Sequence, residues 1–345
     1  MERKFYISSS PHITDTDSIP KIMYSVIGAL IPAGAASIYF FGWQAFWVII
    51  VTIITAVLTE GIIQKLLKRP LNIGDGSAIL TGILLAYNVP AEVPLWLPVV
   101  GAFVGIAVGK MSFGGLGYNP LNPALVGRAF LTASWPVYMT VFETAPRGGT
   151  LSGIDLSNID AITEATPLNV FASVREILLH KSQFTDQVPD AMQALSQLYS
   201  SYSNLFTGRI GGCIGETSAL LLLIGGFYLM YRRIIGWKIP TTYILTVGVL
   251  TWIFGGTDGF FTGDPLFHIL SGGLILGAFF MATDMVTTPV TFKGRLIFGT
   301  GCGILTTVIR LWGGYPEGVS YSILLMNLTT PLLDRYTKPK KFGGK

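Results

Sequence analysis

Residues 43–63 read WQAFWVIIVTIITAVLTEGII and contain one charged side chain, that of Glu60. A helix that crosses a lipid bilayer needs about 20 consecutive, predominantly apolar residues, so this run alone predicts a membrane-spanning helix. The whole chain has the same character: of its 345 residues, 50% are hydrophobic and 12% are charged, with a mean hydropathy of +0.57. Soluble domains are about a quarter charged. The composition therefore predicts an all-α integral membrane protein that lies in lipid.

When the chain is read against this length, ten apolar segments emerge. Those at 77–91, 121–139 and 264–283 are short or begin with polar turns containing Gly or Pro, which is typical of half-helices that enter the membrane already broken. The ten segments are 24–41, 43–63, 77–91, 94–112, 121–139, 211–231, 238–256, 264–283, 294–312 and 318–334. The expected organisation is an N-terminal tail (1–20), a first membrane half (21–139), a long connector (140–209), a second membrane half (210–334) and a basic C-terminal tail (335–345).

The Lys and Arg residues predict the orientation, because cytoplasmic connectors carry an excess of positive charge. The short connectors around Gly42, Val93, Asp258 and Pro316 hold none. We therefore expect both termini in the cytoplasm and the connector 140–209 outside it. The basic side chains stand beside apolar runs and form no separate domain, so the net charge of +4 does not indicate nucleic acid. The connectors expected inside hold Lys65, Lys68, Arg69, Lys110, Arg232, Arg233, Lys238, Lys293 and Arg295.

Two stretches of the chain have weak counterparts further along. Residues 74–80 (GDGSAIL) resemble 215–221 (GETSALL), and 119–121 (NPL) resemble 264–266 (DPL). The related segments are three spans apart and would point in opposite directions, which predicts an inverted repeat with a ligand or ion site near the midplane. Chance similarity of glycine-rich apolar sequence is the alternative.

Several ionisable residues lie within or at the ends of the expected spans. A charge at the bilayer centre costs about 2.5–3.5 kcal/mol even on the mildest scale, so these groups are functional candidates. Asp75, Glu216, Asp264 and Asp284 are the candidates for an ion pathway, and helix capping or mutual pairing is the alternative. Arg310 would bind an anionic cofactor or extend its side chain to the membrane surface. Extension to the surface is the favoured interpretation.

The remaining candidate ligands give no metal site. His268 has no second His or Cys at ligand spacing, so we expect a hydrogen-bonded structural histidine. Cys213 and Cys302 lie far apart in apolar runs, which predicts neither a disulfide nor a metal-binding motif.

The long connector contains residues 160–168, DAITEATPL. Taken alone, the Thr-Pro step is a common helix start. The residue before a proline is restricted to extended backbone angles, so Thr166 is expected to present its side chain outward.

The same residues carry a family resemblance. They are similar to the Asp-x-x-Ser/Thr-Gly-Ala-Thr signature at which a flavinyltransferase attaches FMN in the family of Rnf D subunits and Na⁺-pumping NADH:quinone reductase B subunits. Asp160, Thr163, Ala165 and Thr166 match, whereas Glu164 replaces the usual glycine. The resemblance extends over almost the whole chain and includes 74–78 (GDGSA), 117–124 (GYNPLNPA), 215–219 (GETSA), 282–289 (ATDMVTTP) and 310–318 (RLWGGYPEG).

The resemblance implies a urea-transporter-like membrane fold and an FMN bound covalently through its phosphate to Thr166. It implies an electron-carrying role in a complex that couples ferredoxin and NAD⁺ to Na⁺ or H⁺ movement across a bacterial or archaeal cytoplasmic membrane. The implied partners are the A, B, C, E and G subunits of an Rnf complex and the flavinyltransferase. A second, noncovalent flavin, riboflavin, is also implied, and the candidate turns for it contain Asn119, Asn122, Gly215, Glu216 and Thr217.

Two other functions remain open from the sequence. The quinone-reductase B subunit carries the same flavin signature but a longer N-terminal extension, and quinone in place of ferredoxin would support its turnover. A solute channel of the urea-transporter type needs no flavin at all, so bound flavin distinguishes it from both redox proteins.

Overall fold

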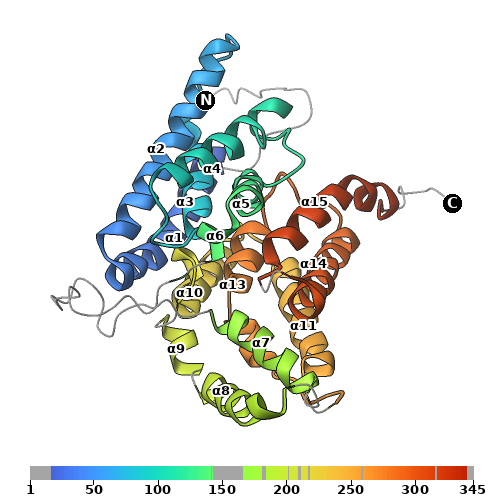
Figure 1. Ribbon diagram of the computed structural model, residues 1–345. Helices are drawn as coiled ribbons and strands as arrows, with labels where there is room; N and C mark the ends of the chain where they lie inside the picture. Colours follow the sequence, from blue (N-terminus) through green and yellow to red (C-terminus); the bar gives the residue numbers. More distant parts are fainter. Residues whose placement is uncertain are drawn as a thin grey trace, which may run out of the picture.

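The computed structural model describes residues 17–140, 142, 166–180, 184–200, 202–208, 211–216, 218–257, 259–314 and 317–339. Within these ranges the protein is helical, and its one β-type pairing is an isolated bridge between Pro90 and Cys213. Figure 1 shows the helices of the first half and of the second half side by side, with α7, α8 and α9 together at one end. The expectation of an all-helical protein is confirmed for the described residues.

The helices fall into three groups along the chain. The first group is α1 (Ile19–Phe41), α2 (Trp43–Leu66), α3 (Ser77–Tyr87), α4 (Trp96–Ala107), α5 (Pro123–Ser134) and α6 (Pro136–Thr140). The connector contributes α7 (Pro167–Leu179), α8 (Val188–Ser200) and α9 (Tyr202–Thr207). The last group is α10 (Ala219–Tyr231), α11 (Lys238–Phe254), α12 (Pro265–Leu270), α13 (Leu274–Leu276), α14 (Phe292–Trp312) and α15 (Val319–Tyr336).

The long helices have the length and surface of membrane spans. By length and composition α1, α2, α14 and the segment Trp96–Phe113 can each cross a bilayer, and α3, α10 and α11 are shorter apolar helices. Large apolar side chains cover the outside of α2, where Ile54, Leu58 and Ile62 are exposed. An apolar surface of this kind suits lipid and not water. The protein is therefore a multi-pass membrane protein.

The three segments expected to be broken are short or interrupted. Helix α3 has 11 residues, and 121–139 divides into α5 and α6 at Trp135. Residues 264–283 comprise α12, α13 and a π-helical turn, Gly277–Met281. The chain is extended at Ser271 between α12 and α13, with φ −87° and ψ 139°. A helix break inside a membrane protein leaves backbone carbonyls without helical partners. These carbonyls need other hydrogen-bond donors.

Short polar side chains begin the half-helices. The Asp75 carboxylate accepts a hydrogen bond from the Ser77 amide at 2.8 Å, at the start of α3. The Asn122 side chain accepts from the Ala124 amide at 3.0 Å, and Asp264 accepts from the Phe267 amide at 3.0 Å. Asn122 and Asp264 are N-caps, which satisfy amides that have no partner in the first helical turn. Asp75 stands one residue before the N-cap of α3, Gly76, and binds an amide of the same kind.

Helix packing repeats along the chain, but not in the predicted register. Helix α2 packs on α3 and α4, and α4 packs on α5; in the second half α11 packs on α12 and α14, and α14 packs on α15. Across the middle, α1 contacts α10 and α5 contacts α15. This pattern matches α2–α5 with α11–α15, whereas the predicted offset of three spans would pair α3 with α10 and α5 with α12. In the observed pattern α3 corresponds to α12, and an aspartate, Asp75 or Asp264, binds an amide at the start of each helix.

The similarity between residues 74–80 and 215–221 has a local cause. Asp75 and Glu216 each end a 3-10 turn, η1 (Ile73–Asp75) and η6 (Ile214–Glu216), just before an apolar helix. Each turn has a glycine followed by an acidic residue, so their sequences are alike although their places in the fold differ.

A buried ion pair joins α2 to the end of α4. Lys110 is 1% exposed, and its Nζ lies 2.6 Å from Glu60 Oε2 and 2.6 Å from Ser77 Oγ. Glu60 is also 1% exposed, and its other oxygen accepts from Gln64 at 3.1 Å. Lys110 is therefore not the solvated connector charge that the sequence predicted, because a carboxylate on α2 draws it into the helix packing.

Candidate functional site

Thr166 is the N-cap of α7. Its backbone is extended (φ −55°, ψ 153°), Pro167 follows in the first turn, and its Oγ1 accepts a hydrogen bond from the Asn169 amide at 3.2 Å. The extended backbone and the helix start are confirmed. The outward side chain is not, because Thr166 is only 5% exposed. The other residues of the signature, Asp160, Thr163 and Ala165, lie outside the described residues.

A cavity of about 530 Å³ lies beside Thr166. Its walls come from α5, from the start of α7 and from the start of α15, so three distant parts of the sequence meet there. The lining residues are Arg128, Ala129, Thr132, Met139, Thr140, Phe142, Thr166, Asn169, Glu317, Gly318, Ser320 and Tyr321.

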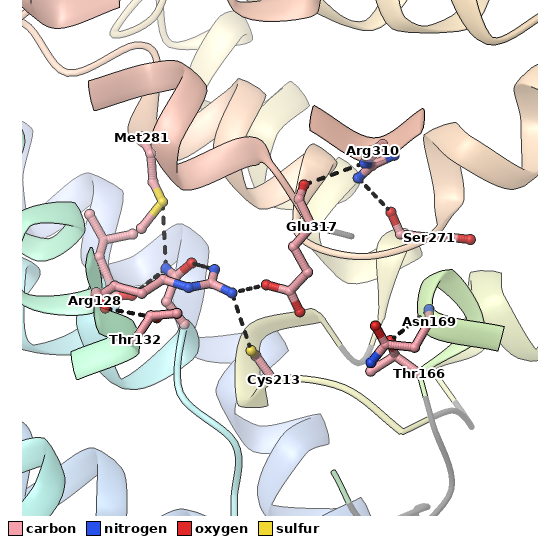
Figure 2. Close-up of polar contacts among 11 residues, drawn as sticks. Arg128, Thr132, Thr166, Asn169, Cys213, Ser271, Met281, Arg310 and Glu317 are labelled. Carbon is pink, nitrogen blue, oxygen red and sulfur yellow. Dashed lines mark hydrogen bonds and ion pairs between the residues drawn. The ribbon is translucent and has the colours of Figure 1, made fainter. Parts of the chain in front are cut away.

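Arg128 holds a fixed position on the cavity wall. It is 7% exposed, forms an ion pair with Glu317, and donates from Nη1 to Asn88 Oδ1 at 2.5 Å (Figure 2). Asn88 is itself held, because its amide nitrogen donates to the Leu84 carbonyl at 2.7 Å. The other terminal nitrogen of Arg128 lies 3.8 Å from Cys213 Sγ. Buried charged side chains are stable when they are paired and hydrogen-bonded in this way.

Behind Arg128 the structure gathers three potential ligand residues. One ligand atom from each of Cys213, Glu216 and Glu317 lies within 4.8 Å of the others. The sequence spacing contained no sign of this group, because Glu317 comes from a distant connector. The guanidinium of Arg128 contacts both Cys213 and Glu317. Arg128 therefore already supplies a positive charge to this group of three residues. Glu216 is 6% exposed, and its Oε1 has no hydrogen-bond partner among the described residues.

Arg310 stabilises the break between α12 and α13. It is 5% exposed and donates to the carbonyl oxygens of His268 at 2.5 Å and Ser271 at 3.1 Å. The expected extension to the membrane surface is therefore wrong: the carbonyls left free by the break are nearer acceptors than the surface.

His268 is buried, but it is not hydrogen-bonded as expected. Neither ring nitrogen has a partner among the described residues. The ring instead packs edge-on against Phe171 and Phe267, with centroid distances of 4.8 and 5.3 Å.

Comparison with known proteins identifies the family of this chain. The family described as NQR2, RnfD, RnfE matches residues 6–343. The chain belongs to this family. Over 341 residues it is 50% identical to the D subunit of a proton-translocating ferredoxin:NAD⁺ oxidoreductase complex from Clostridium ljungdahlii, covering 99% of this chain and 97% of the relative.

Two further relatives carry similar descriptions. The D subunit of a Na⁺-translocating ferredoxin:NAD⁺ oxidoreductase complex from Acetobacterium woodii is 47% identical over 344 residues, with 99% of this chain and 96% of the relative covered. The D subunit of an ion-translocating oxidoreductase complex from Citrobacter koseri is 37% identical over 367 residues, and 99% of each chain is covered.

In this member of the NQR2, RnfD, RnfE family, helix α7 is fastened to the membrane helices. Arg175 donates to the Leu311 carbonyl at 2.7 Å and to the Phe254 carbonyl at 3.3 Å. Phe171 packs against Phe267 on α12 at 5.4 Å. Thr166 thus lies at the start of a docked helix, and the position of its hydroxyl is defined by the fold.

Helix α9 is tied to the same end of the protein, because Tyr202 donates a hydrogen bond to Asp264. Burial, and then this hydrogen bond, raise the pKa of Tyr202, so its hydroxyl stays protonated and remains a donor at neutral pH. Asp264 therefore serves twice, as the cap of α12 and as the acceptor for α9.

We expect Arg175→Ala to loosen α7. Hydrogen bonds that involve a charged group contribute about 1.5–3 kcal/mol each, so the opening of α7 should become at least about tenfold more frequent. Hydrogen–deuterium exchange of the purified protein should show faster exchange in 167–179. The control is Glu176→Ala, because Glu176 is exposed on the same helix. Equal exchange in the two variants would contradict the docking role of Arg175.

The other candidate residues do not converge on one site. Asn119, Asn122 and Asp284 line a second cavity of about 740 Å³, together with Ser77 and Lys110. Gly215 is packed closely against Tyr87, and Glu216 belongs to the Arg128 group. Thr217 lies outside the described residues. The second cavity therefore involves only the first of the two turns suggested for a noncovalent flavin.

Proposed function

We propose that this chain is the electron-carrying membrane subunit of an ion-translocating ferredoxin:NAD⁺ oxidoreductase, and that FMN is bound through its phosphate to Thr166. The observation that carries the proposal is the position of Thr166, at the N-terminus of a docked helix and on the wall of a cavity that Arg128 and Glu317 also line. The descriptions of the relatives, which name D subunits of such complexes, support the functional part. They favour ferredoxin over quinone as the redox partner of the complex.

The local chemistry suits an esterified phosphate. The first amides of an α-helix point toward its N-terminus without helical partners, and the helix dipole adds partial positive charge there. Helix α7 has 13 residues, and the amides of Leu168 and Asn169 belong to its first turn. A phosphate on Thr166 Oγ1 would therefore lie where anions bind well. Pro167 has no amide hydrogen, so the free donors of this turn begin at Leu168.

The side chains around the cavity are of the types that contact a flavin ring. A flavin exchanges one or two electrons, and the protein contributes position and electrostatics. Apolar side chains such as Met139, Phe142 and Tyr321 and the charged pair of Arg128 and Glu317 face this space. The covalent tether keeps the flavin at the site without requiring tight noncovalent binding.

We extend the proposal to the membrane architecture. Ten spans in two groups of five, α1–α5 and α10–α15, would form an inverted repeat of the urea-transporter type, since an odd number of spans reverses the direction of the second group. The packing of α1 against α10 and of α5 against α15 supports this arrangement. Both termini would lie in the cytoplasm and α7–α9 on the opposite side of the cytoplasmic membrane.

Thiol labelling tests this topology. Cysteine introduced at Ser196 on α8 should react with an impermeant reagent from outside intact cells, and cysteine at Lys338 should react only in inverted vesicles. Both positions are exposed, whereas Cys213 and Cys302 are buried and provide the background. Labelling of both positions from one side would contradict the proposed orientation.

The proposal includes partners and a second cofactor. The A, B, C, E and G subunits would supply the ferredoxin and NAD⁺ sites, and a flavinyltransferase would transfer FMN to Thr166. Riboflavin would bind at the second cavity, which Asn119 and Asn122 line. Asp75 and Asp284 remain the ion-pathway candidates that line cavities.

Mass spectrometry tests the central claim. The chain is produced with and without the flavinyltransferase, and the peptide containing Thr166 is sequenced. With the transferase it should gain the mass of FMN less one water, and fragmentation should place the addition on Thr166. An unmodified peptide in the presence of the transferase would contradict the proposal and would favour the solute-channel alternative.

A further inference from the structure

We propose that Arg128 sets the reduction potential of the flavin on Thr166 by compensating the negative charge that electrons bring to it, with Glu317 as an opposing charge. This inference rests on the proposed function. Arg128 would act as a positioning residue of the redox site, and no covalent bond to it forms or breaks.

The cavity beside Thr166 is lined by one pair of charged residues. Of the residues that line it, Arg128 and Glu317 are the charged ones. They come from α5 and from the connector before α15, and they form an ion pair with each other (Figure 2). Any charge that appears in this cavity therefore acts first on these two side chains.

The guanidinium of Arg128 is held in place by its neighbours. Asn88 and Glu317 hold its terminal nitrogens, and Cys213 lies beside one of them. A charge held in a buried site acts strongly because little water screens it, and it needs no rearrangement when the reaction occurs. Arg128 thus has the fixed, desolvated position that tunes a cofactor.

Arg310 provides the contrast. It is as buried as Arg128, but its donors are directed to the backbone carbonyls of His268, Ser271 and Glu317, and it is absent from the cavity wall. Its role is to hold the α12–α13 break. The two buried arginines therefore differ in whether their charge faces the proposed flavin.

Arg128 and Glu317 should shift the reduction potential in opposite directions. An electron delivered by a reduced partner adds one negative charge to the flavin. Arg128 attracts that charge and Glu317 repels it, so loss of Arg128 disfavours the reduced flavin and loss of Glu317 favours it. A purely structural role for the pair would give no such opposition, because either loss breaks the same ion pair.

The test is a potentiometric titration of the flavin in the purified complex, with the flavin absorbance as readout. At the wild-type midpoint potential, Arg128→Gln should lower the ratio of reduced to oxidised flavin at least about tenfold, equivalent to about 59 mV for a one-electron couple. Glu317→Gln should raise the ratio, and the double variant should return toward wild type. Arg128→Lys keeps the charge and should stay near wild type. Arg335→Gln, an exposed change at the far end of α15, is the control.

Shifts of the same sign in the two single variants, or an unmoved potential in Glu317→Gln, would overturn the inference. If Arg128→Gln does not assemble, Glu317→Gln and Arg128→Lys decide by themselves. Flavin fluorescence of the denatured wild-type protein distinguishes a failure of the proposed function from a failure of the role assigned to Arg128. Its absence refutes the proposed function, whereas its presence with unshifted potentials refutes only the role of Arg128.

Discussion

Thr166→Ala should abolish covalent flavin and reduce ferredoxin-dependent NAD⁺ reduction by the complex to background, while the protein remains in the membrane. Alanine has no hydroxyl for the phosphoester, and the proposed electron path would then lack one carrier. The substitution also removes the N-cap of α7, which costs about 0.5–2 kcal/mol. In-gel flavin fluorescence of the denatured chain and activity of the purified complex are the two measurements.

Two variants separate the ester from the cap. Thr166→Asn keeps a capping side chain but cannot form the phosphoester, so it should lose flavin while α7 stays stable. Thr166→Ser keeps both functions and should retain part of the flavin. Covalent flavin in the Thr166→Ala or Thr166→Asn protein would show that the attachment residue has been assigned wrongly.

The sequence could predict those features that depend on neighbouring residues. Apolar runs such as 43–63 indicated the membrane helices, and the Thr-Pro step indicated the start of α7. The burial of Thr166 could not be predicted, because its cover comes from α5 and from the start of α15. The proline restricts the backbone angles of Thr166 and so the direction of its side chain relative to the chain. It does not determine which distant segments pack against that side chain.

Contacts between distant segments were likewise missed. Arg128 and Glu317 are 189 residues apart and belong to no common motif. Glu60 stands inside an apolar run, with no indication that Lys110 is its partner. Two similar turns also suggested a three-span repeat, whereas the helix contacts match α2–α5 with α11–α15. Local sequence similarity reports the geometry of a turn, whereas the register of a repeat depends on the packing.

The second large expected effect concerns the pair of Glu60 and Lys110. Lys110→Met should leave Glu60 as an uncompensated buried charge and destabilise the protein by about 3–5 kcal/mol, the typical cost of breaking a buried ion pair. Glu60→Gln should also destabilise, because it removes the charge partner of Lys110. The double variant removes both charges, so its loss should be clearly smaller than the sum of the single losses.

Unfolding of the purified protein in detergent, driven by heat or by added SDS, measures these changes. Lys65→Met is the matched control, since Lys65 is exposed on the same helix as Glu60 and should change stability little. Additive losses in the double variant would mean that the two side chains act independently. The contact of Lys110 with Ser77 Oγ would then be the interaction to test next, because Ser77 begins α3 and ties that half-helix to the same ammonium group.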